Sequence, residues 1–328
     1  MEKKRVLSGM RPSGKLHLGN LFGALANWVK LQDEYECYYM VADWHALTTD
    51  FKNTSEIRDN IREMVIDWIS SGLDPERCVM FVQSKVPEHT ELHLILSSFT
   101  PVAWLERCPT YKEQLQQLKD MEINTYGFLG YPVLQAADIL IYRASAVPVG
   151  EDQLPHLELT REIARRFNYF YGNMLVEPKA LLTRVPRLLG TDGRKMSKSY
   201  DNCIYLSDAD KVVYNKVKSF ITDPQRIKLD DAGHPDICSV FDYYKVFRPE
   251  EAKDIARKCS RGECGCVDCK NRLADYILKL LEPIHEKRKE LESKPGRIDD
   301  ILEEGNKKAR KIAARMIIEL KEAMKMNY

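Results

Sequence analysis

The stretch VLSGMRPSGKLHLGNLFGALANWV, residues 6–29, decides the fold. It begins with a short apolar run, Val6-Leu7-Ser8, that is typical of a buried strand, and continues into a glycine-rich turn. A helix follows, and its apolar face is formed by Leu21, Phe22, Leu25, Trp28 and Val29. A strand, a glycine-rich turn and a helix N-terminus favour a bound phosphate, because free backbone N–H groups and the helix dipole attract an anion.

Outward from this stretch, apolar strands alternate with helical patterns. Further strands are expected at residues 38–42, 79–82 and 147–149, and a helix between Ile57 and Trp68. Strands that alternate with helices predict an α/β fold with a Rossmann-like, doubly wound parallel sheet. After about Tyr205 the pattern is helical with no clear strand. We therefore expect a catalytic domain over residues 1–200 and a helical domain over 201–328, whose last helix packs back on the catalytic domain.

The charge balance and the first residues limit the class of protein. Fifty basic residues oppose 49 acidic ones, which gives a net charge of +1. This balance argues against a strongly basic nucleic-acid binder, although a local basic face remains compatible with it. The start MEKKRVLSGM has no apolar signal region, and no apolar run has the length of a membrane span. We expect a cytoplasmic protein without membrane association, with reduced thiols.

The turn at residues 9–15 nearly matches a phosphate-binding P-loop. Position 16 is Leu, whereas that motif needs a Ser or Thr hydroxyl for magnesium, so a P-loop NTPase is disfavoured. His17 has the chemistry to donate to a phosphate oxygen, and Gly19 leaves room for a base or ribose against the backbone. The alternative interpretation is that His17 and Asn20 only cap the first helix.

A second basic loop lies far downstream, at Lys195-Met196-Ser197-Lys198-Ser199, after Gly190 and Gly193. Two ammonium groups on a loop that closes would stabilise the charge that builds on a leaving phosphate. The alternative for a lysine pair of this spacing is a solvated basic loop, but the full five-residue string is much rarer than the pair.

HLGN at 17–20 followed by KMSKS at 195–199 resembles the paired signatures of class I aminoacyl-tRNA synthetases. More narrowly, YPVLQAADILIY at 131–142, VPVGEDQ at 147–153 and HLELTREIARRFN at 156–168 resemble the bacterial-type tryptophanyl-tRNA synthetases. The resemblance covers nearly the whole chain and is strongest from 5 to 205. One departure is HLGN where the signature reads HIGH; Asn20 then takes the place of the second His and still has hydrogen-bonding groups for phosphate or ribose.

The resemblance implies L-tryptophan, ATP with Mg²⁺ and tRNA(Trp) as substrates, and a homodimer. It assigns Asp138 as the acceptor for the indole N–H, a buried group that would reject apolar analogues. It implies a tryptophan site formed by Leu7, His45, Tyr131, Gln135, Asp138, Val147, Val149 and Gln153. It implies an ATP site formed by Arg11, Pro12, Ser13, Gly19, Asn20, Gly150, Glu151, Asp152, Val185, Lys195, Met196, Ser197, Lys198 and Ser199. It gives the catalytic role to His17, Asn20, Lys195 and Lys198.

Five of the nine cysteines fall between residues 238 and 269. Their thiolates suit zinc or an iron–sulfur cluster, and the remaining interpretation is incidental buried thiols. A subset of the tryptophanyl enzymes has a similar C…C-x6-C-x2-C pattern and carries a four-iron four-sulfur cluster. The resemblance therefore implies a 4Fe–4S cluster, with Zn²⁺ as the alternative, held near the tRNA anticodon by Cys238, Cys259, Cys266 and Cys269. Cys264 is then the spare thiol, with replacement of Cys266 at one ligand position as the alternative.

Two other functions compete with tryptophan activation. Tyrosyl-tRNA synthetase is the nearest rival within the same class, but VPVGEDQ and ELTREIA favour the tryptophan enzyme. A metal-containing nucleic-acid-binding regulator that has lost catalysis would be expected to have broken signatures, whereas Lys195 and Lys198 are both present. The basic run at residues 307–311 is either a tRNA-binding face or a solvated helix.

Overall fold

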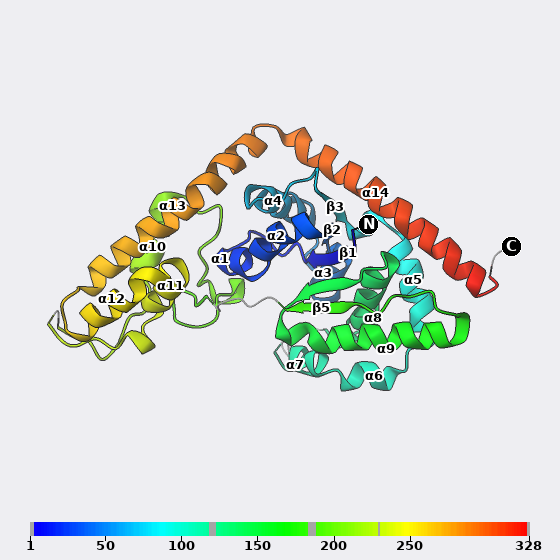
Figure 1. Cartoon of the computed structure of the whole chain (residues 1–328), viewed down its shortest axis with the longest axis horizontal. Helices are drawn as coiled ribbons and strands as arrows, with labels where there is room; N and C mark the ends of the chain where they lie inside the picture. Colours follow the sequence, from blue (N-terminus) through cyan, green and yellow to red (C-terminus); the bar gives the residue numbers. More distant parts are fainter. Residues whose placement is uncertain (1–2, 118–122, 183–187, 229, 327–328) are drawn as a thin grey trace. The chain divides into compact units, whose positions relative to one another are not determined.

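Five parallel strands form one sheet in the order β3-β2-β1-β4-β5 (Figure 1). The computed structural model describes residues 3–117, 123–182, 188–228 and 230–326. The strands are β1 (Arg5–Met10), β2 (Glu36–Val41), β3 (Cys78–Val82), β4 (Ala146–Val149) and β5 (Lys179–Leu182). The predicted Rossmann-like fold class is confirmed; β5 was not among the strands that the sequence predicted.

The described chain divides into two compact units. The first comprises Met1–Gly14, Asn27–Arg184 and Lys294–Tyr328, and the second comprises Lys15–Ala26 and Val185–Ser293. Helices of the first unit are α2 (Ala26–Glu34, from its second residue), α3 (Asp43–Asp50), α4 (Ile57–Ser70), α5 (Glu88–Ser97), α6 (Val102–Arg107), α7 (Pro109–Gln117), α8 (Tyr126–Ile141), α9 (Leu154–Tyr171) and α14 (Pro295–Ala323). The assignment of function to residues 1–200 and 201–328 stays a prediction.

Aromatic side chains bury both faces of the sheet in the first unit. On one face Trp28 of α2 stacks on Tyr39 of β2 with ring centroids 4.6 Å apart, and Trp68 of α4 meets Trp28 edge-on at 5.4 Å. On the other face Tyr38 of β2 stacks on Tyr142, just after α8, at 5.1 Å. Because successive strand residues point to opposite faces, the adjacent Tyr38 and Tyr39 fill the two layers of the doubly wound fold.

The last helix, α14, covers the edge strand β3 and runs past α5 (Figure 1). Gly305 makes the close approach possible, because a Cβ at this position would lie 1.7 Å from the carbonyl oxygen of Met80. The side-chain oxygen of the next residue, Asn306, accepts a hydrogen bond of 2.8 Å from the backbone N–H of Val82. The helix therefore pairs a strand edge that would otherwise remain open to other chains.

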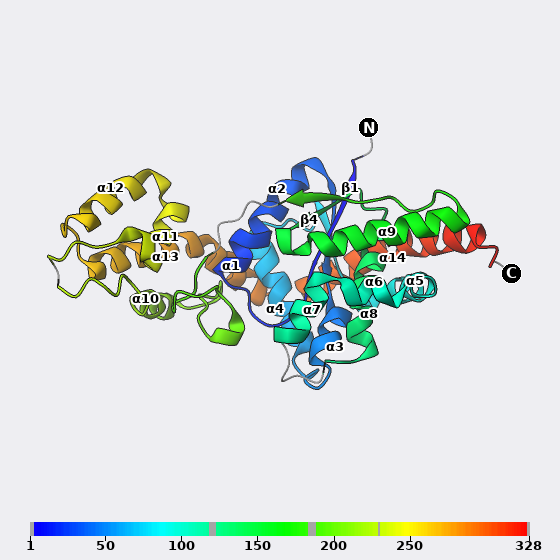
Figure 2. The ribbon, with the colours of Figure 1, turned by 90° about the horizontal axis from the view of Figure 1, so that it is seen from below.

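Helices form most of the second unit, and Figure 2 shows α10 to α13 gathered as one group. They are α10 (Asp210–Lys218), α11 (Ser239–Phe247), α12 (Pro249–Ser260) and α13 (Cys266–Glu292), preceded by α1 (Leu18–Asn20) and a π-helical segment (Leu21–Leu25). In the part of the chain that the structure describes, no helix is long and apolar enough to cross a membrane.

Candidate active site

Two predicted phosphate-binding segments follow neighbouring strands of the first unit. Residues 11–13 come after β1, and residues 150–152 come after β4. The strand order turns back between β1 and β4, since β2 and β3 extend the sheet to one side of β1 and β4 and β5 to the other. In open parallel sheets, ligands bind at the carboxyl ends of the strands next to such a reversal. The Arg11 guanidinium here donates to the Thr49 hydroxyl at 3.2 Å.

A buried carboxylate, Asp138 of α8, is the centre of a hydrogen-bond network in the first unit. Its Oδ1 accepts from Nε2 of Gln83 at 2.8 Å and lies 2.6 Å from Nδ1 of His89. Its Oδ2 lies 2.7 Å from Nε2 of His45 and 3.0 Å from Nε2 of Gln83. The Oε1 of Gln83 accepts from the backbone N–H of His45 at 3.4 Å, which orients the Gln83 amide donor toward Asp138. Nε2 of His89 in turn lies 2.8 Å from the Tyr142 hydroxyl.

The network keeps Asp138 ionised. Burial alone would raise the pKa of this carboxyl group, but the hydrogen bonds from His45 and His89 outweigh it and hold the pKa below its usual range. An ionised carboxylate accepts about four hydrogen bonds. The side chains of Asp138 and His89 are 2% and 0% exposed, whereas that of His45 is 13% exposed. His45 is thus the more accessible of the two imidazoles.

The remaining predicted tryptophan-site residues lie on α8, on β1 and β4, and in the turn after β4. Leu7 of β1 and Val147 and Val149 of β4 are buried in the same hydrophobic core cluster. The Tyr131 hydroxyl of α8 lies 2.9 Å from Nε2 of His156 at the start of α9. Burial raises the pKa of Tyr131 and lowers that of His156 to about 4, so both groups are neutral at pH 7. Gln135 lies half-buried on α8, and Gln153 donates to Asp152 at 3.0 Å.

The paired signatures come together within the second unit. The backbone on either side of His17 is bonded to the segment after the lysine loop, with Leu18 N–H donating to Ile204 and Leu206 N–H to Leu16. Gly19 is closely surrounded, because a Cβ there would lie 2.9 Å from the His17 ring and 3.7 Å from the Met196 sulfur. The side-chain oxygen of Asn20 accepts from the His17 N–H at 3.0 Å, so the predicted capping role of Asn20 is present.

Asn202 holds the lysine loop in shape. Its carbonyl oxygen accepts from the Ser197 N–H at 2.8 Å, and its amide donates to the Lys195 carbonyl at 3.1 Å and to Asp192 at 2.7 Å. Asn202 is 1% exposed. Lys195 and Ser199 remain exposed and only Met196 of the five residues is buried. The loop is therefore fixed through its backbone, while the side chains of Lys195 and Ser199 stay exposed.

His17 is neutral at physiological pH. Burial, and then the positive charge of Lys198, lower its pKa to about 4. Its Nδ1 atom is buried and has no hydrogen-bond partner among the described residues. A buried polar atom without a partner is costly unless a ligand pairs with it. The arrangement thus suits a bound anion with acceptor oxygens, close to the positive charge of Lys198.

Comparison with known proteins identifies the family. A model of the family described as tRNA synthetases class I (W and Y) matches residues 1–282. The chain belongs to the class I tRNA synthetases. It is 50% identical to the tryptophan–tRNA ligase of Thermotoga maritima, over 99% of this chain and 100% of that protein. The corresponding enzyme of Aquifex aeolicus is 45% identical, over 98% and 100%. The tryptophanyl-tRNA synthetase of Campylobacter jejuni, solved with ADP and tryptophan, superposes with a TM-score of 0.88 at 35% identity, over 98% and 99%.

The site residues predicted from the sequence of this class I synthetase differ from those that the structure places in the site. The structure adds Gln83, His89 and Asn202, which the sequence interpretation did not include. A positional signal existed for Gln83, since it directly follows the carboxyl end of the parallel strand β3. Val185, predicted to contact adenine, lies outside the described residues. The ligand contacts assigned to individual residues stay predictions.

The clustered cysteines of this synthetase lie close together in the second unit. The sulfur of Cys269 is 3.9 Å from that of Cys264, and Gly233 leaves no room for a Cβ beside the Cys259 sulfur. Burial, and then the neighbouring Cys264 thiol, raise the pKa of Cys259 to about 11. Within the described ranges, no three His, Cys, Asp or Glu side chains are arranged to hold a metal ion. The five thiols therefore gather in one region without a metal-binding arrangement, and the ligand set of Cys238, Cys259, Cys266 and Cys269 stays a prediction.

Proposed function

We infer that the chain activates L-tryptophan with ATP to tryptophanyl-adenylate and transfers the tryptophanyl group to tRNA(Trp). The observation that carries this inference is the buried Asp138 carboxylate with its donors Gln83, His45 and His89. The chain in which it lies is similar over its full length to tryptophan–tRNA ligases. These identities favour tryptophan over tyrosine as the substrate. They also favour an enzyme over a regulator without catalysis.

We propose that Asp138 accepts a hydrogen bond from the indole N–H after His45 releases its own hydrogen bond to the carboxylate. All four acceptor positions of the carboxylate are filled by Gln83, His89 and His45, so a new donor must replace one of them. His45 is more exposed than the fully buried His89. Phenylalanine has no N–H to offer in exchange, and it would leave the buried carboxylate short of one hydrogen bond, which costs about 1–3 kcal/mol or more for a charged group.

The first chemical step is in-line attack of the tryptophan carboxylate on the α-phosphorus of ATP, with pyrophosphate as the leaving group. ATP arrives with Mg²⁺ as part of the substrate. We propose that neutral His17 donates to a phosphate oxygen and that Lys195 and Lys198 stabilise the charge of the leaving pyrophosphate. No proton has to leave the ionised tryptophan carboxylate, so catalysis rests on positioning and electrostatics.

In the second step, a terminal ribose hydroxyl of the tRNA attacks the adenylate carbonyl and AMP leaves.

We propose that the helices of residues 201–328 bind the anticodon region, that the enzyme works in the cytoplasm, and that it is a homodimer. Leu94 of α5 and Val102 of α6 are 67% and 55% exposed, which leaves apolar surface for a second copy. Light scattering should then give about twice the chain mass of 38.0 kDa.

Amino-acid-dependent ATP–pyrophosphate exchange tests the proposed reaction. The purified chain is assayed with tryptophan, tyrosine and phenylalanine in separate reactions, and then for aminoacylation of a tRNA(Trp) transcript. We expect exchange with tryptophan alone, followed by charging of the transcript. Exchange that depends on tyrosine, or no exchange with any of the three, would overturn the proposal.

The predicted 4Fe–4S cluster is a separate proposal. It is supported by the gathering of Cys238, Cys259, Cys266 and Cys269 with the spare Cys264 in one region. An absorbance band near ~400 nm in anaerobically purified protein, with matching iron, would support it. Colourless protein with stoichiometric zinc would favour the alternative metal, and protein without either metal would leave a cluster of structural thiols.

A further inference from the structure

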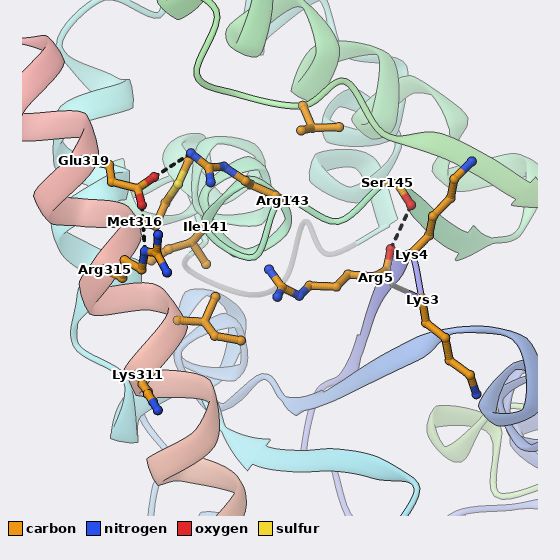
Figure 3. A pocket seen from close by; sticks show the side chains of 12 residues that line it. Lys3, Lys4, Arg5, Ile141, Arg143, Ser145, Lys311, Arg315, Met316 and Glu319 are labelled. Atoms are coloured by element: carbon orange, nitrogen blue, oxygen red, sulfur yellow. Dashed lines mark hydrogen bonds and ion pairs between the residues drawn. The ribbon is translucent and has the colours of Figure 1, made fainter. Parts of the chain in front are cut away.

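A basic pocket of about 550 Å³ lies in the first unit, between the start of β1 and α14 (Figure 3). None of the predicted substrate-binding residues lines it. Its lining includes six cationic side chains and one carboxylate, that of Glu319. The cations are Lys3, Lys4, Arg5, Arg143, Lys311 and Arg315. So many positive groups around one concave surface create a potential that attracts anions.

Only part of this positive charge is neutralised within the protein. Glu319 accepts from Arg143 at 2.6 Å and from Arg315 at 2.9 Å, and Glu36 accepts from Arg5 at 2.9 Å. Two carboxylates therefore form ion pairs with three arginines and neutralise their charge only in part. Lys4 and Lys311 have no ion pair among the residues that the structure describes.

The basic run on α14, residues 307–311, does not form one continuous cationic surface. Lys307 pairs with Glu303 and Lys308 with Glu304, each one helical turn away. Arg310 pairs with Glu88 of α5. The first part of the run is therefore a self-neutralised helix face, and Lys311 alone of the run lines the basic pocket.

The floor of the basic pocket is apolar. Its accessible surface comes from the half-buried Ile312, because Ile141 of α8 is fully buried and Met316 of α14 is only 3% exposed. Figure 3 shows Arg5 pointing across the pocket toward α14, which presents Lys311 and Arg315 on the facing side. A cationic rim over an apolar floor suits a ligand that combines a phosphate with a flat, weakly polar ring. The volume is in the range of small-molecule sites.

The basic pocket is separate from the predicted ATP-binding segments. Arg5 stands at the first residue of β1, whereas Arg11 follows its last. At about 3.3 Å per residue, these positions are roughly 17–20 Å apart along the strand. Ligands at the carboxyl edge of the sheet would thus leave this pocket free.

We propose that the basic pocket binds a nucleotide, with its phosphate among Arg5, Lys311 and Arg315 and its base against Ile312 on the apolar floor. The same chemistry is presented by a free mononucleotide and by a nucleotide of a single-stranded RNA segment. An inorganic phosphate would use the cations but leave the apolar floor uncovered.

The test compares two double variants of the full chain that remove equal charge from α14. Lys311→Ala with Arg315→Ala alters the pocket rim, and Lys307→Ala with Lys308→Ala is the matched control. Binding is measured by calorimetry with tryptophan and a non-hydrolysable ATP analogue present, so that the active site is filled. The probes are cytidine 5′-monophosphate, a short 5′-phosphorylated oligoribonucleotide and inorganic phosphate.

We expect the rim variant to weaken nucleotide binding about tenfold or more, because two charge-assisted contacts are lost, and the control to change it less than about twofold. Loss with both the mononucleotide and the RNA supports a free-nucleotide site. Loss with the RNA alone supports an RNA site, and its salt dependence should then fall by about 0.7 per lost phosphate contact.

Equal affinity of the rim and control variants for every probe would overturn the proposal. So would inorganic phosphate that binds as tightly as the mononucleotide, since the floor would then contribute nothing. Tryptophan-dependent pyrophosphate exchange should be unchanged in both variants, and a selective loss of exchange in the rim variant would contradict the separation of the two sites. Absence of exchange in the unmodified chain would overturn the proposed synthetase function alone.

Discussion

The Asp138 network and the lysine loop are opposite physical solutions to handling charge. Asp138 is 2% exposed and is fixed by the side chains of Gln83, His45 and His89. Lys195 remains exposed, and its loop is fixed through the backbone by Asn202. A buried, fixed acceptor discriminates between amino acids, because an unpaired group there is costly. The exposed Lys195 keeps its hydration until a phosphate arrives, so its charge costs little in the empty enzyme.

The largest effect should come from the lysine loop. We expect Lys198→Ala to lower the rate of adenylate formation about 10²–10³-fold, since one preorganised group that faces developing charge is lost. The dissociation constant for tryptophan should change little. Stopped-flow or quench-flow measurements give the rate, and calorimetry gives the affinity. Lys211→Ala on α10 is the control for loss of an exposed lysine. Equal, small effects on rate and affinity would remove Lys198 from the chemical step.

The Asp138 network should respond in affinity rather than rate. We expect Asp138→Asn to weaken tryptophan binding about 10–100-fold, because a charge-assisted hydrogen bond is replaced and His45 and His89 lose their ionised partner. Equilibrium titration with tryptophan measures this change. The exposed Asp59→Asn on α4 serves as the control. Tryptophan affinity that is unchanged in Asp138→Asn would separate this carboxylate from indole recognition.

The buried His17 should make stability depend on pH. Its pKa of about 4 in the folded chain lies below the value of about 6.5 expected when unfolded, so the unfolded state binds more protons between these values. The free energy of unfolding should fall as the pH drops from about 6.5 toward 4, by about 2 kcal/mol at pH 5 from His17. Urea unfolding of the parent and His17→Gln chains tests this, with a shallower pH dependence expected for the variant. Parallel pH profiles would contradict a depressed pKa for His17.

The smallest effect should come from the support of the loop. Asn202→Ala removes the bonds to the Ser197 N–H and the Lys195 carbonyl but leaves both lysines in place. We expect about a tenfold slower adenylate formation, from the loss of roughly 1–1.5 kcal/mol of positioning. Asn215→Ala on α10 is the exposed control. If Asn202→Ala keeps the parental rate, the loop does not need this anchor.

Most of the fold was predictable from sequence, because β1 to β4 are short apolar runs that alternate with helical patterns. The strand β5 was missed, since Lys179–Leu182 is short and none of its four residues is fully buried. The Asp138 partners were out of reach for another reason. Gln83 and His89 lie 55 and 49 residues from Asp138, and only the folded sheet and helices bring them to it.

The lysine loop at residues 195–199 was also only partly predictable from sequence. KMSKS is recognisable as a string, but the role of Asn202 depends on how the backbone turns between Gly190 and Tyr205. Gly190 itself is explained only by the structure, because a Cβ there would lie 2.2 Å from the Asn202 side chain. Site residues that lie together in one short segment could be predicted from sequence. Contacts between residues that are distant in the sequence could not.

Single-turnover adenylate formation at saturating tryptophan tests the central claim most directly, that Asp138 acts in selection and Lys198 in the chemical step. With enough tryptophan to fill the site, Asp138→Asn should approach the parental rate, because uniform binding is restored by concentration. Lys198→Ala should remain about 10²–10³-fold slow under the same conditions. A slow Asp138→Asn enzyme at saturation together with a fast Lys198→Ala enzyme would contradict this division of roles.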